Sequence, residues 1–199
     1  MQPMRASYPA TFTFDPPEKI ANWRPLVQWI LAIPHFVVLY VLGLVSQVLG
    51  LVSWLIILFT GNLPEGIANF QALYIRYSMR VGLYSTFLVE EYPPFSFDMA
   101  TTDPGDVPRA RVDIAPELTN RNRVTCVFRL LLAIPQFVVV AILGIGAWIA
   151  FAISFFAVLF TGSWPGGLRD YVIKVYRWNV RLQTYLLLLT DVYPPFSLD

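Results

Sequence analysis

Long apolar blocks alternate along the chain with shorter polar segments that are rich in proline and charge. Residues 25–64 and residues 130–168 contain no Asp, Glu, Lys or Arg. A helix of a soluble domain normally keeps one polar face toward water, so charge-free stretches of this length are unusual in soluble proteins. About 20 apolar residues suffice to cross the hydrocarbon of a bilayer. The pattern therefore predicts two membrane-embedded helical blocks.

The length of each block leaves two arrangements open. Residues 26–59 would measure about 51 Å as a straight helix, which exceeds a hydrocarbon thickness of about 30 Å. In one arrangement Pro34 and Pro135 kink the helix, and the residues after the kink span once. In the other the first block bends near Gly43 or Gly50 and returns as a hairpin. Lys and Arg flank both blocks on both sides, and these residues favour the cytoplasmic side. This favours the hairpin, which leaves both ends there.

Several short motifs recur 101 residues further along the chain. They are Leu-Ala-Ile-Pro at 31–34 and 132–135, Leu-Phe-Thr-Gly at 58–61 and 159–162, an arginine pair at 76/80 and 177/181, and Tyr-Pro-Pro-Phe-Ser at 92–96 and 193–197. A single offset for all of them indicates a tandem duplication. The predicted organisation is a polar lead-in (1–24), a first membrane repeat (25–97), an exposed linker (98–122) and a second membrane repeat (123–199).

Each copy also contains local signals for strands and helix ends. Residues 11–14 and 111–114 alternate apolar and polar side chains, which predicts short extramembrane strands. Gly61 and Gly162 follow the apolar blocks and are natural helix C-caps, since the prolines after them cannot continue a helix. The predicted fold is an all-α integral membrane protein to which short strands can be added.

A second, more polar helix is expected in each copy, at residues 66–90 and 167–191, with a basic stripe along one side. An arginine at mid-membrane costs at least about 2.5–3.5 kcal/mol, so we expect these helices at the membrane interface. The candidate residues for contact with lipid headgroups or a partner are Arg76, Arg80, Lys174, Arg177 and Arg181. The alternative is that they are solvated or bridge to carboxylates elsewhere in the fold.

Composition and the rare residue types narrow the chemistry. Charged residues make up 14% of the chain and the formal net charge is +1, which gives no reason to expect a nucleic-acid partner. Cys126 is the only cysteine and His35 the only histidine, so neither a cysteine-based nor a histidine-based metal site is expected, and no cofactor. His35 has Gln136 at the matching position of the second copy, and we interpret it as structural.

The acidic residues give no sign of catalysis. Glu90, Glu91 and Asp191 are expected to be charge partners at helix ends or between repeats. No Gly-x-Ser-x-Gly nucleophile motif occurs in the chain, so serine hydrolase chemistry lacks its usual signature. No Asp, Glu, Lys or Arg lies within either apolar block, which argues against an ion pump. We therefore expect a protein that is not an enzyme.

The ordered motifs resemble the bacterial domain of unknown function 4389. The resemblance is carried by Leu-Leu-Ala-Ile-Pro-(His/Gln)-Phe, Leu-Phe-Thr-Gly-x-x-Pro, Arg-x-x-x-Arg-x-x-x-Tyr and (Glu/Asp)-x-Tyr-Pro-Pro-Phe-Ser, in both copies. It implies a bacterial protein of the cell (inner) membrane whose biochemical role is not established. The basic flanks are expected on the cytoplasmic side because of the positive-inside rule. It supplies no catalytic residues, and the lipase label carried by some members finds no support in these residues.

The first functional hypothesis is a non-catalytic membrane scaffold or accessory subunit, whose partners are membrane lipid and either other membrane subunits or a second copy of itself. Glycine and serine residues in the apolar blocks would allow close helix packing. The alternative is a lipid-binding or membrane-shaping protein that uses hairpins and basic interfacial helices. A lipid-modifying enzyme is the third reading, with His35 as its only candidate base.

Overall fold

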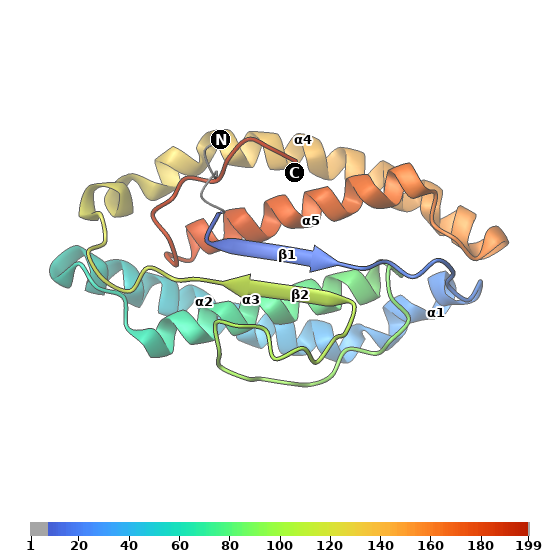
Figure 1. Cartoon of the computed structure of the whole chain (residues 1–199), viewed down its shortest axis with the longest axis horizontal. Coiled ribbons are helices and arrows are strands. Elements are labelled where there is room, and N and C mark those ends of the chain that lie inside the picture. Colours follow the sequence, from blue (N-terminus) through green and yellow to red (C-terminus); the bar gives the residue numbers. More distant parts are fainter. Residues whose placement is uncertain (1–7, 199) are drawn as a thin grey trace, which may run out of the picture.

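The computed structural model describes residues 8–198, so the first seven residues of the predicted lead-in and Asp199 lie outside the described residues. Within the described range the chain is mostly helical, and its elements run along one common long axis (Figure 1). In chain order they are β1 (Ala10–Phe14), α1 (Arg24–Leu31), α2 (Ile33–Thr60), α3 (Glu65–Ser85), β2 (Ala110–Ile114), α4 (Arg123–Thr161) and α5 (Gly166–Leu186).

The two predicted strands form, and they pair with each other. β1 and β2 are antiparallel, with Phe12 opposite Val112. Alternate side chains, including Phe12, Val112 and Ile114, are buried, whereas Thr11 and Thr13 are exposed. The alternation seen in the sequence therefore corresponds to one face on the core and one face toward solvent.

The helices lie in pairs around the strand pair. β1 packs on α5 and β2 on α3, while α3 in turn packs on α2 and α5 on α4. In Figure 1 the strands run lengthwise between α5 and α3, in the same direction as the long helices. The buried core joins residues of the strands, α3 and α5 with a few residues of α2 and α4. The molecule thus has a strand side and, beyond α3 and α5, a long-helix side.

The hairpin arrangement is wrong. α2 is one continuous helix through both Gly43 and Gly50, and α4 is continuous over 39 residues. Neither block reverses direction within its length (Figure 1). Glycine lowers helix stability by only about 1 kcal/mol, whereas a turn in an apolar environment would leave several backbone N–H and C=O groups without partners. The segment also lacks the turn residues that would satisfy them.

The proline that recurs in both copies, Pro34 and Pro135, occupies a different place in the helix of each copy. In the first copy the helix is interrupted at Ala32, and Pro34 lies in the first turn of α2, where its missing N–H is not needed. Backbone hydrogen bonds from Ala32 N to Gln28 O and from Phe36 N to Ala32 O, both 3.0 Å, hold α1 and α2 end to end. In the second copy α4 continues through Pro135.

Both long helices end at the repeated glycines. Gly61 has φ 74° and Gly162 has φ 68°, the left-handed region that favours glycine. Their N–H groups donate to Ile57 O and Val158 O, each at 2.8 Å. These bonds satisfy carbonyl groups at the helix end that would otherwise lack a partner.

The duplication is also visible in how the copies hold each other. Ile20 N donates to Gly162 O at 2.7 Å, and Arg121 N donates to Gly61 O at 2.9 Å. The two donor residues are 101 positions apart in the sequence, and so are the two acceptor residues, which is the offset between the copies. Each copy therefore binds the other through the same surface, as the subunits of a two-fold dimer do.

The linker is more than the exposed connection that we expected. It contains β2, and Asp103 and Val107 are buried within it. It also contributes the carboxylates that meet the arginines of α3. Proline and mixed charge predicted an irregular path here, but no local pattern indicated that this path packs over a helix.

Candidate functional site

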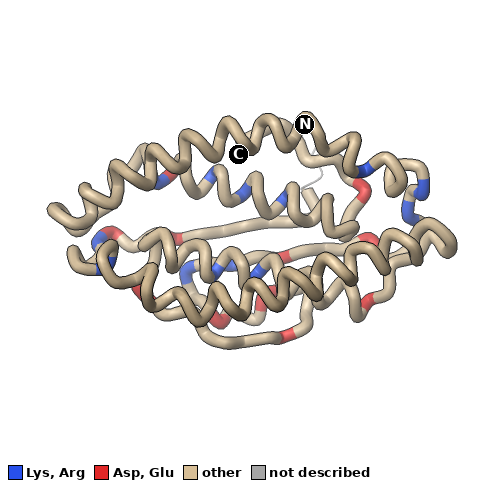
Figure 2. Tube along the Cα trace, turned by 180° about the vertical axis from the view of Figure 1, so that it is seen from behind, with Lys and Arg blue, Asp and Glu red and all other residues tan. Residues whose placement is uncertain are grey.

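Large exposed apolar side chains gather on α1, α2 and α4. We call this outward surface the apolar face. Its exposed members include Trp29, Val37, Tyr40, Val48, Leu51, Phe59, Leu130, Ile142, Ile145, Trp148, Phe156 and Phe160. α2 and α4 are long and apolar enough to cross a membrane, judged by length and composition. Charged residues lie at the helix ends and on the other elements, and leave long stretches of α2 and α4 uncharged (Figure 2). Soluble monomers rarely expose so extensive an apolar surface.

A narrow stripe of small and polar residues attaches α2 to α3. Gly43, Ser46 and Ser53 are buried on the inner side of α2. The Ser46 hydroxyl donates to Gln71 Oε1, and Gln71 Nε2 donates back to Ser46 O at 2.9 Å. The ring of Tyr74 lies over Gly43, at the distance of ordinary contact for an added Cβ. Small residues and paired polar groups are the features that join helices in an apolar environment.

Position 35 and its counterpart 136 make matching contacts. His35 is fully buried, and its Nδ1 is hydrogen-bonded to the Tyr77 hydroxyl at 2.6 Å. Gln136 accepts from Trp178 Nε1 at 2.9 Å and donates to Pro194 O at 2.7 Å. Tyr77 and Trp178 are themselves 101 positions apart. The geometry gives both residues the same task of joining a long helix to its neighbour.

Arg76 and Arg80 are buried beneath the linker. Arg80 pairs with Asp103 at 3.2 Å and with Asp106 at 3.0 Å, while Arg76 Nε lies 3.8 Å from Asp103. Asp103 is almost fully buried, and it also accepts from Val112 N at 2.9 Å, which ties β2 to α3. Burial lowers the pKa of Arg76, and the charge of Asp103 acts in the opposite direction.

These contacts agree with one of the two interpretations of the first arginine pair. Both guanidinium groups are occupied by carboxylates and carbonyls of the same chain and expose 3–4% of the side chain. They therefore bridge to carboxylates elsewhere in the fold.

Two of the three candidate basic residues of α5, Arg177 and Arg181, donate to the chain's own backbone. Arg177 Nε donates to Phe12 O of β1 at 3.4 Å. Arg181 donates to Ser197 O and lies 5.8 Å from the Trp178 ring centroid. Lys174 is half-buried on the same helix. The basic stripe of α5 thus borders β1 and the C-terminal segment.

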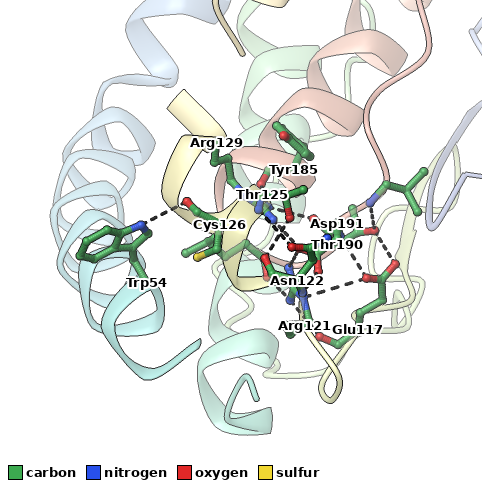
Figure 3. Close-up of polar contacts among 12 residues, drawn as sticks. Trp54, Glu117, Arg121, Asn122, Thr125, Cys126, Arg129, Tyr185, Thr190 and Asp191 are labelled. Carbon is green, nitrogen blue, oxygen red and sulfur yellow. Dashed lines mark hydrogen bonds and ion pairs between the residues drawn. The ribbon is translucent and has the colours of Figure 1, made fainter. Parts of the chain in front are cut away.

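A second ion cluster joins the start of α4 to the segment after α5 (Figure 3). Arg121 and Arg129 both point at Asp191, with Arg121 Nη2 2.7 Å from its Oδ1. Asn122 N donates to the other oxygen of Asp191 at 2.7 Å. Glu117 adds a second carboxylate 4.0 Å from Arg121 Nε and accepts from Asp191 N at 3.0 Å. The cluster fixes three chain segments at one end of the second copy.

The charges of this cluster are balanced locally. Burial acts to raise the pKa of Asp191, but hydrogen bonds from Arg121 and Asn122 N, together with the charge of Arg129, lower it overall. The first copy has a similar ion cluster with fewer charges. In it Glu90 accepts from Ala21 N and lies 4.0 Å from Arg24. The prediction that these carboxylates are charge partners is confirmed for Asp191 and Glu90, and also for Glu91, which accepts from Arg109 Nε at 3.3 Å.

The sequence did not single out Arg121 and Arg129, and one signal could have found them. Both precede the second apolar block, and the acidic residue before Tyr-Pro-Pro recurs in both copies. A repeated acid with basic residues at the opposite end of its repeat indicates a contact between those ends. Among the described residues, no three or more His, Cys, Asp or Glu side chains come together as a possible metal site.

Comparison with known proteins gives one match. A family model described as a domain of unknown function (DUF4389) matches residues 22–96 and residues 123–197. The two matched ranges coincide with the two copies of the duplication, and together they cover most of the chain. No curated protein and no solved structure matches.

Proposed function

The chain belongs to the DUF4389 family, and we propose that it is a non-catalytic scaffold or accessory subunit of the bacterial inner membrane. The apolar face holds it in the bilayer, and the strand side faces the cytoplasm. One observation carries the proposal: the outward surfaces of α2 and α4 are apolar, while the described arginines of α3 turn to partners inside the fold.

The direction of the strands supports insertion from one side. β1 and β2 run parallel to the long axis of α2 and α4, near the middle of the molecule (Figure 1). If the long helices crossed the bilayer, Arg111 and Asp113, whose side chains are 53% and 37% exposed, would lie within it. Ionised side chains are costly to place in hydrocarbon, even where two of them form an ion pair. If α2 and α4 lie in the plane of the membrane, the same residues face water.

In-plane insertion also agrees with the positions of the basic residues. Both flanks of both apolar blocks are basic, and in this arrangement all four flanks lie on one side of the membrane. The positive-inside rule then makes that side the cytoplasm. The expectation of a shared side, which came from the basic flanks, is retained, although the hairpin that was favoured because of it is not formed.

A scaffold role fits the contacts better than a role in binding anionic headgroups. The latter needs free basic side chains at the interface, whereas Arg76 and Arg80 are occupied by Asp103 and Asp106. The apolar face is suited to lipid chains, helices of another membrane subunit or a second copy of this chain.

Cysteine labelling in intact cells tests the topology. In a Cys126→Ala background, we propose single cysteines at the exposed positions Asn62 and Thr102 and at the half-buried position Ser163. All three should react with a membrane-impermeant maleimide only after the cytoplasmic side is opened. The protein should also remain in the membrane after an alkaline carbonate wash. Labelling of any one position from outside, or release by carbonate, contradicts the arrangement.

The scaffold role has its own test. The protein should purify in a mild detergent as a stable complex with another membrane subunit or with a second copy of itself. A monomer with no partner after in-cell cross-linking contradicts this role, while leaving the topology to be judged by the labelling.

A further inference from the structure

The long-helix side contains a cavity of about 520 Å³. Its walls come from α2, through Phe36, and from α4, through Trp148 and Phe151. α5 and the C-terminal end of α3 close it from the inside. Phe36 and Trp148 also belong to the exposed apolar surface, so the cavity opens on the apolar face. Its volume lies within the about 300–1,000 Å³ typical of small-molecule sites.

The lining is uncharged, and several of its polar groups are already hydrogen-bonded. No Asp, Glu, Lys, Arg or His lines the cavity among the described residues. Ser85 Oγ donates to Gly82 O at 3.1 Å, Thr86 Oγ1 donates to the same oxygen at 2.8 Å, and Asn179 Nδ2 donates to Val175 O at 3.1 Å. Such a site favours a hydrocarbon occupant, since apolar cavities bind apolar groups in preference to water.

Comparison of the two copies shows how the cavity arises. In the first copy, Ser46 and Gln71 lock α2 to α3 through two hydrogen bonds. The residues 101 positions later are Ala147 and Val172, and both line the cavity. The polar lock of the first copy is therefore replaced in the second by two side chains that cannot hydrogen-bond. At the same level Gly144 leaves open space beside α4.

We propose that this cavity binds one acyl chain of a membrane phospholipid. The inference rests on the proposed function, because only a protein whose apolar face lies in the bilayer presents the opening to lipid. The uncharged lining accepts the chain and not the headgroup. A bound chain fills the space between α2 and α4 and becomes part of the packing that joins the two copies.

The direct test uses a photoreactive lipid. The full chain is reconstituted into phosphatidylcholine vesicles that contain a trace of phosphatidylcholine with a diazirine in one acyl chain. After illumination, cross-linked peptides are identified by mass spectrometry. The cross-link should concentrate on the α4 peptide that carries Trp148 and Phe151. Replacing the probe with its phosphatidylglycerol equivalent should leave the yield unchanged, because no charged side chain lines the cavity.

Two variants close the cavity in different ways. Ala147→Ser combined with Val172→Gln copies the polar lock of the first copy, and Gly144→Phe fills the space from α4. Each should reduce the yield at that peptide about tenfold, which corresponds to about 1.4 kcal/mol of lost binding free energy. Gly50→Phe is the matched control, because Gly50 also has open space beside a long apolar helix but does not line the cavity. Its yield should equal that of the wild type.

The outcomes separate the two proposals. If the wild type stays in the membrane and the cross-links spread evenly over α2 and α4, or if both closing variants keep the wild-type yield, the acyl-chain site is wrong and the proposed function stands. A yield that requires the anionic probe also contradicts the acyl-chain site. If the wild type does not associate with vesicles at all, the proposed function fails first.

Discussion

Arg121 and Arg129 expose 0% and 4% of their side chains, and Asp191 is the carboxylate that both of them face. Removing one partner of a buried ion pair leaves an uncompensated charge, which costs about 3–5 kcal/mol. The stability of the second copy therefore depends strongly on this one acid. The two arginines also donate to backbone carbonyls of Leu188 and Tyr185, so their position is fixed even where the charge is removed.

Asp191→Asn should lower the unfolding free energy of the detergent-solubilised protein by about 3–5 kcal/mol at neutral pH. Thermal unfolding at pH 7 measures this change. Asp170→Asn on the same copy is the control, because the Asp170 side chain is 66% exposed and its replacement should stay within about 0.5 kcal/mol. Equal effects of the two substitutions would show that the cluster adds no stability.

The pH dependence of stability should follow from the same residue. The pKa of Asp191 is lowered in the folded protein, so its contribution is complete above the unfolded-state value of about 3.9 and is lost as pH falls through the folded-state pKa. The wild type should lose stability as pH falls from about 5 through the unfolded-state pKa of about 3.9. Asp191→Asn should lose less over that range, because Asn does not titrate. Parallel curves for the two proteins would contradict this assignment.

Which arginine meets which carboxylate could not be predicted from the sequence. Arg80 and Asp103 are joined across a proline-containing loop, and Arg129 and Asp191 lie at opposite ends of the second repeat. Charge and composition indicated that these groups need partners. The identity of the partners depends on the path of the connecting chain, which propensity and periodicity do not specify.

At the scale of single elements, the sequence correctly predicted those strands and helix ends that depend only on neighbouring residues. The alternating segments form β1 and β2, and the repeated glycines end α2 and α4. The hairpin failed because block length was read against bilayer thickness, which assumes that a helix crosses the bilayer. A helix that lies along the surface has no such limit on its length.

The two C-cap glycines give a matched pair for measuring local strain. Gly61→Ala should destabilise the protein by about 1 kcal/mol, because φ 74° disfavours an L side chain while the added Cβ meets only the end of Arg123 at 3.6 Å. Gly162→Ala should cost about 2–3 kcal/mol, because its Cβ would also lie 3.0 Å from the backbone oxygen of Ile20.

Thermal unfolding of both variants measures the difference. Gly50→Ala lies within α2 with open space around it, so it should be neutral or slightly stabilising. A Gly162→Ala variant no less stable than Gly61→Ala would show that the contact between copies at Ile20 adapts freely.

At the scale of the whole molecule, the exposed apolar helices of both copies lie on one side and the strands on the other. Apolar side chains cover α1, α2 and α4, and the strands with their charged neighbours lie beyond α3 and α5. The duplication accounts for this shape, because two units related by a two-fold axis place their long helices on the same side. The sequence predicted the apolar blocks and the repeat, and the relative placement of the blocks comes from contacts between the copies.

The central claim is that α2 and α4 lie in the plane of the membrane. The depth of residues along α2 tests it most directly. Spin labels at Val37, Val48 and Phe59, each at least 60% exposed, sit 11 residues apart on nearly one side of the helix. Successive labels are therefore about 16 Å apart along its axis. In lipid vesicles, oxygen and nickel-complex accessibility should place all three at the same depth, as in-plane insertion requires. A label at Val48 about 10 Å or more deeper than both others would mean that α2 crosses the bilayer, and would contradict the account.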